Sequence, residues 1–222
     1  MPIHKTKDEN IFKKWMPDMA YVLGFIAADG ALIKNKRGAC FLEIQSTDKE
    51  IVYKIRSVFK SNLAIGEYQP KHENHNRRYR LQIGSKEIFS DLLKLGIKPK
   101  KSKTIKLPDV PDKYFSHFLR GYFDGDGSAN ICTYKQKGRQ KPSTVLNCGF
   151  VSGSKRILFG IKSKLAKMFV IKGGTLYYHQ GYRLWFSIKD SLSLYRFMYG
   201  GSIGDLFLAR KKMVFERYLS SD

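Results

Sequence analysis

The chain has 222 residues, of which 42% are hydrophobic and 14% aromatic, so it can bury a core as one domain or two small ones. Lys and Arg total 41 against 19 Asp and Glu, and this formal net charge of +22 indicates a polyanionic partner. No apolar run approaches the ~20 residues of a membrane span, no signal-peptide core opens the chain, and three cysteines without a CxxC pair argue against a disulfide framework or a zinc site.

The first half of the chain predicts the order helix, two strands, helix, two strands, helix. We expect helices at about 17–28, from Asp48 as N-cap, and at 85–95, with strands at 30–36, 39–46, 65–71 and 77–84. Strands joined as hairpins form an antiparallel sheet, and the helices then cover one of its faces.

The second half repeats this order. Helices are expected at about 113–125, from Ser154, and at 189–199, with strands at 128–135, 144–152, 173–179 and 182–188. Apolar positions of 48–57 match those of 154–163, which indicates a duplicated domain. The prediction is an α+β protein of two pseudo-symmetric αββαββα repeats, an N-terminal repeat at 1–112 and a C-terminal repeat at 113–222.

The first helix of each repeat ends in nearly the same sequence, VLGFIAADG at 22–30 and LRGYFDGDG at 119–127. Small residues four positions apart let two helix backbones approach closely, so these helices are expected to pack against each other through a shared set of small residues. That set is Gly24, Ala28, Gly121 and Gly125. Helix packing alone does not explain why both motifs end in an acidic residue followed by glycine.

Packing the helices in this way brings Asp29 and Asp126 together at one end. The helix dipole disfavours carboxylates at a helix C-terminus, so a cation is expected nearby. Carboxylates with surrounding carbonyls, such as those of Ala28 and Gly125, are hard oxygen ligands suited to Mg²⁺, for which Mn²⁺ can substitute. Beside a phosphate, such a site predicts metal-assisted hydrolysis of phosphodiesters.

Alternating strand positions put donor-rich side chains on one face of each sheet. An ordinary half-solvated sheet has the same alternation, but residues 1–112 carry a net charge of +9 and residues 113–222 a net charge of +13. Two sheets forming one groove over duplex DNA therefore fit better. Trp185 is equally compatible with stacking on a sugar or base and with being a half-buried strand residue. The expected DNA-contacting residues are Lys34, Lys36, Gln45, Arg78, Arg80, Gln82, Arg183, Trp185 and Ser187.

With these motifs the chain resembles the LAGLIDADG homing endonucleases over nearly its whole length, in their single-chain, two-motif form. The resemblance implies a saddle of two sheets on double-stranded DNA and Mg²⁺-dependent cleavage of both strands at a long asymmetric site, leaving short 3′ overhangs. It also implies a monomer encoded in an intron or as a free-standing reading frame, acting inside an organelle, a prokaryote or a phage-infected cell and not secreted.

Residue by residue, the resemblance makes Asp29 and Asp126 the metal-binding catalytic acids. Asp48, with Gln45 close by, falls on the position that orients water, whereas its counterpart Ser154 departs from the pattern, so the two strands are expected to be cut with unequal ease. The basic residues late in each repeat that would steady the scissile phosphate correspond to Lys101 and Lys211. The sixth motif position is Ala27 in one repeat and Asp124 in the other, and Asp124 is expected either to support packing or to lie behind the metal-binding acids and support them.

Other interpretations remain. A protein of the same fold that no longer cleaves would act as an intron RNA maturase or a DNA-binding regulator, but a pure binder has no need of paired acids. An intein is disfavoured because the ends show no splicing nucleophile and no terminal His-Asn pair. The run 72–76, His-Glu-Asn-His-Asn, superficially suggests an HNH nuclease, yet contact with DNA or plain solvation is the stronger expectation in a hairpin loop.

Overall fold

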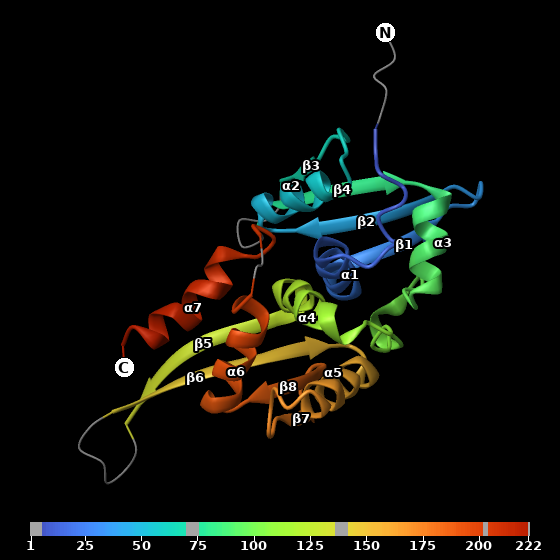
Figure 1. The fold of residues 1–222 in the computed structure, drawn as a ribbon. Coiled ribbons are helices and arrows are strands. Elements are labelled where there is room, and N and C mark those ends of the chain that lie inside the picture. Colours follow the sequence, from blue (N-terminus) through green and yellow to red (C-terminus); the bar gives the residue numbers. More distant parts are fainter. Residues whose placement is uncertain (1–5, 70–75, 136–141, 202–203, 222) are drawn as a thin grey trace.

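Two four-stranded antiparallel sheets flank a central pair of helices in the computed structural model, which describes residues 6–69, 76–135, 142–201 and 204–221 (Figure 1). The run 72–76 lies outside the described residues except for its last position. Within the described ranges, no helix combines the length and the apolar character that crossing a bilayer requires.

The first repeat follows the predicted order. Its elements are α1 (Pro17–Asp29), β1 (Gly30–Lys34), β2 (Cys40–Ser46), α2 (Lys49–Val58), β3 (Gly66–Tyr68), β4 (Arg78–Gly84) and α3 (Lys86–Lys94). The strand order is β1-β2-β4-β3, and the register pairs Leu42 with Ile83 and Ile44 with Leu81, all of them buried. This register gives the sheet one apolar face toward the helices and one polar face.

The second repeat has the same topology. Its elements are α4 (Asp112–Asp126), β5 (Gly127–Tyr134), β6 (Ser143–Ser152), α5 (Lys155–Lys167), β7 (Thr175–Tyr178), β8 (Tyr182–Phe186) and α6 (Ile188–Tyr199). The strand order is β5-β6-β8-β7. Phe150 of β6 meets Tyr122 and Phe123 of α4 through tilted and edge-to-face ring contacts, so the sheet closes directly onto the motif helix.

The central helices α1 and α4 lie side by side between the two sheets (Figure 1). Residues 19–27 of α1 are buried on every face of the helix, and a helix that is apolar all round belongs in a protein interior. Because residues 118–124 of α4 are buried as well, the core runs from one sheet through both helices to the other.

Two elements were missing from the sequence prediction. A single 3₁₀ turn, η1 (Lys101–Lys103), lies in the segment that joins the repeats, and a further helix, α7 (Ala209–Leu219), follows α6. The periodic signal for α7 was present, since Phe215 and Tyr218 are spaced as one buried helix face. The cluster of basic residues at its start drew the prediction toward phosphate contact instead.

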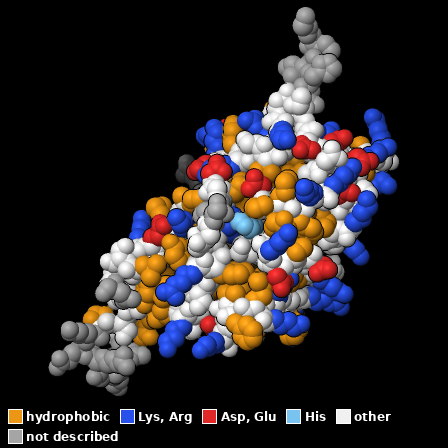
Figure 2. Space-filling model, viewed as in Figure 1, with side chains coloured by type: hydrophobic (Ala, Val, Ile, Leu, Met, Phe, Trp, Pro, Cys, Tyr) orange, Lys and Arg blue, Asp and Glu red, His pale blue; other side chains and the backbone are white. Residues whose placement is uncertain are grey.

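Strand ends were also predicted too long. β1 ends at Lys34, so Lys36 lies in the hairpin turn, and β8 ends at Phe186, so Ser187 is the N-cap of α6 and not a strand residue. Both side chains are nevertheless exposed. Lys and Arg side chains are spread over the whole visible face in Figure 2, in keeping with the net positive charge of both halves.

Candidate active site

Glycines at matching positions bring the backbones of α1 and α4 into contact. A Cβ atom built on Gly24 would lie 2.0 Å from the carbonyl oxygen of Phe118, and one built on Gly121 would lie 2.0 Å from the carbonyl oxygen of Tyr21. Neither carbonyl can move without moving its helix, so any larger residue at either glycine would push the helices apart.

The same close contact continues to the C-terminal ends of the two helices, where the acids lie. A Cβ built on Gly125 would be 2.4 Å from the Cβ of Ala28 and 3.3 Å from Oδ2 of Asp29. Asp29 is the last residue of α1 and Asp126 is the last residue of α4. Close packing therefore delivers the two acids to one place, from two different repeats.

Two pockets open beside these acids, one toward each sheet. The first, of 260 Å³, lies against the first repeat and is bordered by Asp29, Gln45, Ser46, Thr47, Asp48, Arg78, Asp124, Gly125 and Arg210. The second, of 340 Å³, lies against the second repeat and is bordered by Ala27, Ala28, Asp29, Lys101, Ser102, Ile105, Asp126, Val151, Ser152, Gly153, Gln180 and Gly181. Asp29 borders both pockets, and Asp126 borders the second together with Asp29.

The acids repel each other in a partly desolvated place. Burial raises the pKa of Asp126 to about 7, the charge of Asp29 raises it further, and Lys101 and Lys211 oppose the rise. Asp29 is exposed to solvent, but surrounding protein atoms still desolvate its carboxylate and raise its pKa. The charges of Lys211 and Lys101 oppose this rise. Two carboxylates held this way favour a bound cation.

Lys211, in the first turn of α7, is buried at the end of α4. Its ammonium group donates to the carbonyl oxygens of Phe123 (2.7 Å), Asp124 (2.8 Å) and Gly127 (2.7 Å), with that of Gly125 at 3.3 Å. These are carbonyls at the negative end of the helix dipole. Burial lowers the pKa of Lys211 to about 8, and nearby Asp124 limits the fall.

Lys101 is held more loosely at the end of α1. It lies in η1, directly after Lys100, whose backbone is left-handed with φ of 55°, and among the described residues its ammonium group has one hydrogen bond, 3.3 Å to the carbonyl oxygen of Ala28. Burial lowers its pKa, and Asp126 and Asp29 oppose the change. Lys101 and Lys211 are 6% and 7% exposed, whereas Lys100 and Lys103 are exposed, which separates them from their neighbours in the sequence.

The carbonyls of Ala28 and Gly125, proposed from sequence as metal ligands, are the ones that these two lysines approach at 3.3 Å. A carbonyl oxygen has two lone pairs, so these contacts leave each carbonyl able to take a second partner.

Asp48 makes a bidentate ion pair across the two repeats. Arg210 of α7 donates to both of its carboxylate oxygens, at 2.9 and 2.7 Å, and these hydrogen bonds lower the pKa of Asp48. Asp48 and Gln45 border the same pocket as Asp29. At the equivalent position of the second repeat, Ser154 is 1% exposed and its hydroxyl donates to the carbonyl oxygen of Ile105 at 2.7 Å. The two pockets are therefore chemically unequal.

Asp124, expected to support packing, is 3% exposed and joins three elements. Its Oδ2 accepts from the hydroxyl of Tyr21 in α1 (2.7 Å) and from the backbone N–H of Leu208, the N-cap of α7 (2.9 Å). Burial raises its pKa to about 6, and the hydrogen bond from Tyr21 limits the rise.

Glu43, which the sequence did not single out, organises three of the expected DNA-contacting side chains on the first sheet. Its carboxylate accepts from Gln45 (2.7 Å) and Gln82 (3.2 Å) and pairs with Arg80 (3.5 Å). The register places Gln45 opposite Arg80 and Glu43 opposite Gln82, so the contacts of Gln82 and Arg80 cross from β4 to β2, whereas that of Gln45 stays within β2. Arg78 and Lys34 are exposed.

On the second sheet, Trp185 is half-buried above Gly149, where a Cβ would lie 2.5 Å from the indole ring. Arg183 donates to the carbonyl oxygen of His179 at 3.2 Å, and both Arg183 and Trp185 keep part of their surface in solvent. The two sheets thus present different side chains at matching positions.

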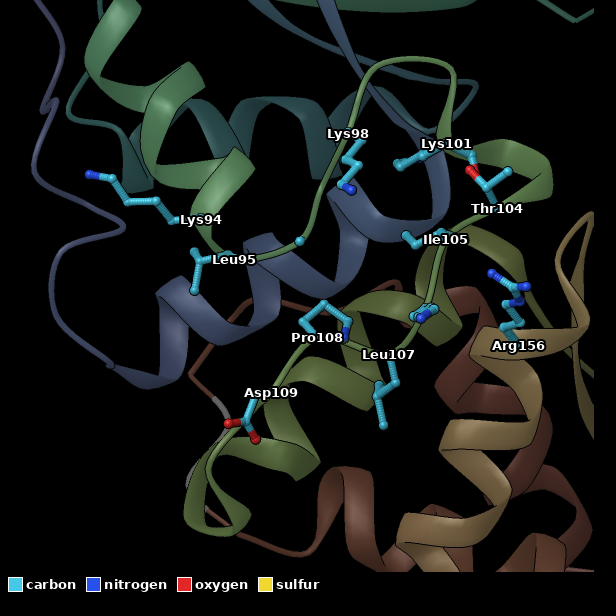
Figure 3. Close-up of a pocket in the computed structure, with 12 residues that line it drawn as sticks. Lys94, Leu95, Lys98, Lys101, Thr104, Ile105, Leu107, Pro108, Asp109 and Arg156 are labelled. Carbon is cyan, nitrogen blue, oxygen red and sulfur yellow. The ribbon is translucent and has the colours of Figure 1, made fainter.

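A third pocket, of 520 Å³, lies at the segment that joins the repeats (Figure 3). Lys98 and Lys101 reach into it from the two arms of that segment, Arg156 approaches from α5, and Lys94 points away. Lys101 also borders the 340 Å³ pocket. No sequence motif predicts this pocket, because Lys98 and Lys101 are brought together by the left-handed turn at Lys100 in the linking segment.

Comparison with known protein families gives a match at residues 16–96, to the family described as LAGLIDADG-like domain. Two curated relatives come from Methanocaldococcus jannaschii. DNA-directed RNA polymerase subunit Rpo1C is 26% identical over 159 residues, 69% of this chain and 18% of that protein, and an uncharacterised protein is 26% identical over 128 residues, 57% of this chain and 44% of that protein. The chain therefore spans less than half the length of either relative.

Solved structures resemble the chain along most of its length. The homing endonuclease I-WcaI bound to its DNA recognition sequence matches with a TM-score of 0.63 at 17% identity, over 92% of this chain and 90% of that one. The LAGLIDADG meganuclease I-AabMI bound to uncleaved DNA matches with a TM-score of 0.64 at 15% identity, over 93% and 90%. The chain therefore carries a LAGLIDADG-like domain at residues 16–96 and has, over most of its length, the two-repeat fold of the LAGLIDADG homing endonucleases.

Proposed function

We propose that the chain is a site-specific endonuclease that acts as a monomer, cleaves both strands of a long asymmetric duplex with Mg²⁺ or Mn²⁺, and leaves short 3′ overhangs. One observation carries the proposal. Asp29 and Asp126, one from each repeat, border the same pocket, Asp29 also borders the second pocket, and each helix end that holds an acid also receives a buried lysine.

The donor set suits a divalent cation that keeps part of its water. Among the described residues, no group of three or more His, Cys, Asp or Glu side chains could enclose a metal ion. Two carboxylates and two nearby carbonyls remain, and Mg²⁺ is commonly bound by one or two carboxylates together with water and phosphate oxygens. When bound, such a cation polarises the phosphate and lowers the pKa of a coordinated water.

The residues of the chain supply the other roles. Asp29 and Asp126 would hold the cation, and their ionised forms would be the binding forms. Lys211, with its pKa lowered to about 8, remains mostly protonated at neutral pH and offers positive charge to a phosphate beside α4. Asp48 and Gln45 border the pocket at Asp29, where their oxygens are available to orient a water molecule.

Duplex DNA is the partner that the charge and the solved structures favour. The structural neighbours are homing endonucleases bound to DNA, and both repeats of this chain carry excess Lys and Arg. Because the two sheets present different side chains, a single chain would read an asymmetric site, whereas a symmetric dimer would read a palindrome.

A non-cleaving RNA maturase or DNA-binding regulator of the same fold is the second candidate. The placement of Asp29 and Asp126 beside one pocket argues against it, because a protein that only binds nucleic acid gains nothing from two carboxylates that repel each other beside a phosphate.

Selection of cleaved sites from a randomised duplex library tests the proposal. The purified chain is incubated with the library in Mg²⁺, and linear products are sequenced, with an EDTA incubation as control. We expect one asymmetric site to emerge in Mg²⁺ and none in EDTA. An absence of recovered sites in Mg²⁺, while the same protein still enriches a duplex by binding, would overturn the endonuclease and favour the second candidate.

A further inference from the structure

The sixth position of the two motifs differs, and the structure gives this difference a consequence. Asp124 occupies the position in the second repeat and Ala27 in the first. Asp124 is nine-tenths buried, accepts two hydrogen bonds through Oδ2, and its Oδ1 has no partner among the described residues. Burying a carboxylate that accepts two hydrogen bonds is unfavourable. The interactions that Asp124 makes should therefore explain why an acid occupies this position.

The relevant interactions of Asp124 are with the first turn of α7. Leu208 donates its N–H to Asp124, and its carbonyl accepts from the N–H of Lys211 at 3.0 Å. The ammonium group of Lys211 then returns to the carbonyl oxygen of Asp124 itself, at 2.8 Å. The side chain of Asp124, the N-cap of α7 and the side chain of Lys211 thus form one closed chain of hydrogen bonds at the end of α4.

The described residues of the first repeat form no such closed chain of hydrogen bonds. The side chain of Ala27 has no acceptor, and Lys101 is carried by a three-residue 3₁₀ turn, where within the described part of the chain its ammonium group has one hydrogen bond, of 3.3 Å, to the carbonyl oxygen of Ala28. The acid at the sixth motif position therefore occurs in the repeat whose late lysine is bound to several carbonyls, and alanine occurs in the repeat whose lysine is bound to one.

We propose that Asp124 is a positioning residue that fixes the start of α7, and through it Lys211, so that the half-site containing Lys211 is held ready for cleavage while the half-site containing Lys101 is not. This inference rests on the proposed function. Asp124 touches neither DNA nor cation in this account, and it acts only by holding Leu208 in place. The strand served by Lys211 is cut first, and the nicked duplex precedes the double-strand break.

The variants separate positioning from simple packing. Asp124→Leu removes the acceptor, whereas Asp124→Asn keeps a side-chain carbonyl for Leu208 and Tyr21. Tyr21→Phe is the matched control, because it removes the other hydrogen bond to the same oxygen and leaves that of Leu208. Lys211→Met identifies the strand that Lys211 serves, by the strand it slows.

Single-turnover cleavage of each strand, labelled separately, is the activity readout. Asp124→Leu is expected to slow the Lys211 strand at least about tenfold relative to the other strand, with the Kd for the duplex changed less than about twofold. Asp124→Asn should restore the strand ratio to within about threefold of the unmodified protein, and Tyr21→Phe should leave it unchanged. Combining Asp124→Leu with Lys211→Met should slow that strand little more than Lys211→Met alone.

Amide hydrogen exchange supplies a readout that needs no cleavage. Asp124→Leu should speed exchange at 208–212, whereas Tyr21→Phe should leave exchange there unchanged. If Asp124→Leu does not fold, Leu208→Pro removes the same N–H from the other side, since φ of Leu208, −86°, is close to that of proline. Equal slowing of both strands, an Asn variant as slow as the Leu variant, or unchanged exchange at 208–212 would each overturn the inference. A chain that cuts no duplex at all refutes the proposed function. In that case the hydrogen-exchange result alone tests whether Asp124 fixes the start of α7.

Discussion

At the scale of single residues, the site is built from acids and lysines whose charges are only partly compensated. Burial and the charge of Asp29 raise the pKa of Asp126, which favours its neutral form, and burial lowers the pKa of Lys211, which also favours the neutral form. The two lysines and the two acids stabilise one another without closing into direct ion pairs among the described contacts. A cation that neutralises the acids would therefore relieve a repulsion that the fold already contains.

The raised pKa of Asp126 predicts how stability changes with pH. The folded pKa of about 7 exceeds the ordinary value of 3.8, so the folded state holds the proton more tightly than the unfolded state does between these two values. Without metal, ionised Asp126 destabilises the fold fully above pH 7, and this effect fades as the pH falls toward 4. Asp126→Asn should therefore raise the Tm more at pH 8 than at pH 4.5.

Thermal unfolding of both proteins in EDTA at the two pH values measures this difference. Asp109→Asn, a change at an exposed aspartate of the linking segment, is the control and should show no comparable dependence. A gain in Tm for Asp126→Asn that is equal at pH 4.5 and pH 8 would contradict the repulsion described here.

Much of this site could be predicted from the sequence, and the rest depended on contacts between distant residues. Asp29 and Asp126 follow from the repeated motif. The bond of Arg210 to Asp48 spans 162 positions in the chain, and no local pattern announces such a pair. Glu43 was visible as a sheet residue, but its role as a shared acceptor depends on the register of β2 against β4.

At the scale of elements, the α1–α4 contact decides where everything else lies. The order of helices and strands was predictable because hydrophobic residues recur with clear helical or strand periodicity, and because the same pattern occurs in both repeats. α7 was missed because its basic first turn was interpreted as a phosphate contact. In the structure that turn is tied to α2 through Asp48 and to α4 through Asp124, so α7 fastens one repeat to the other.

Gly24→Ala tests the helix contact directly. The added methyl group would meet the carbonyl oxygen of Phe118 at 2.0 Å, and because the obstacle is backbone, the helices must separate. We expect a loss of about 3 kcal/mol or more in the free energy of unfolding, measured by denaturant titration. Gly201→Ala is the control, since a Cβ there meets nothing within 4 Å. A Gly24→Ala protein as stable as the control would show that the two backbones are not in contact as described.

At the scale of the whole molecule, two similar repeats form one protein with two different pockets. Charge is spread over both halves, with a net of +22 for the chain, whereas the groups beside the acids differ: Asp48, Arg210 and Asp124 at one pocket, Lys101 and Ser152 at the other. A duplicated fold with unequal pockets suits a duplex whose two strands are treated differently and a recognition site without symmetry.

The most direct measurement compares binding with cutting on the duplex that the chain binds most tightly. Binding is measured in EDTA and cleavage in Mg²⁺, for the unmodified chain, Asp29→Asn, Asp126→Asn and the control Asp109→Asn. We predict that the unmodified chain and the control cut both strands. The two motif variants should lose double-strand cleavage by at least about a thousandfold while their Kd stays within about threefold. Tight binding of that duplex by the unmodified chain, with no cleavage in Mg²⁺ or Mn²⁺, would contradict the account.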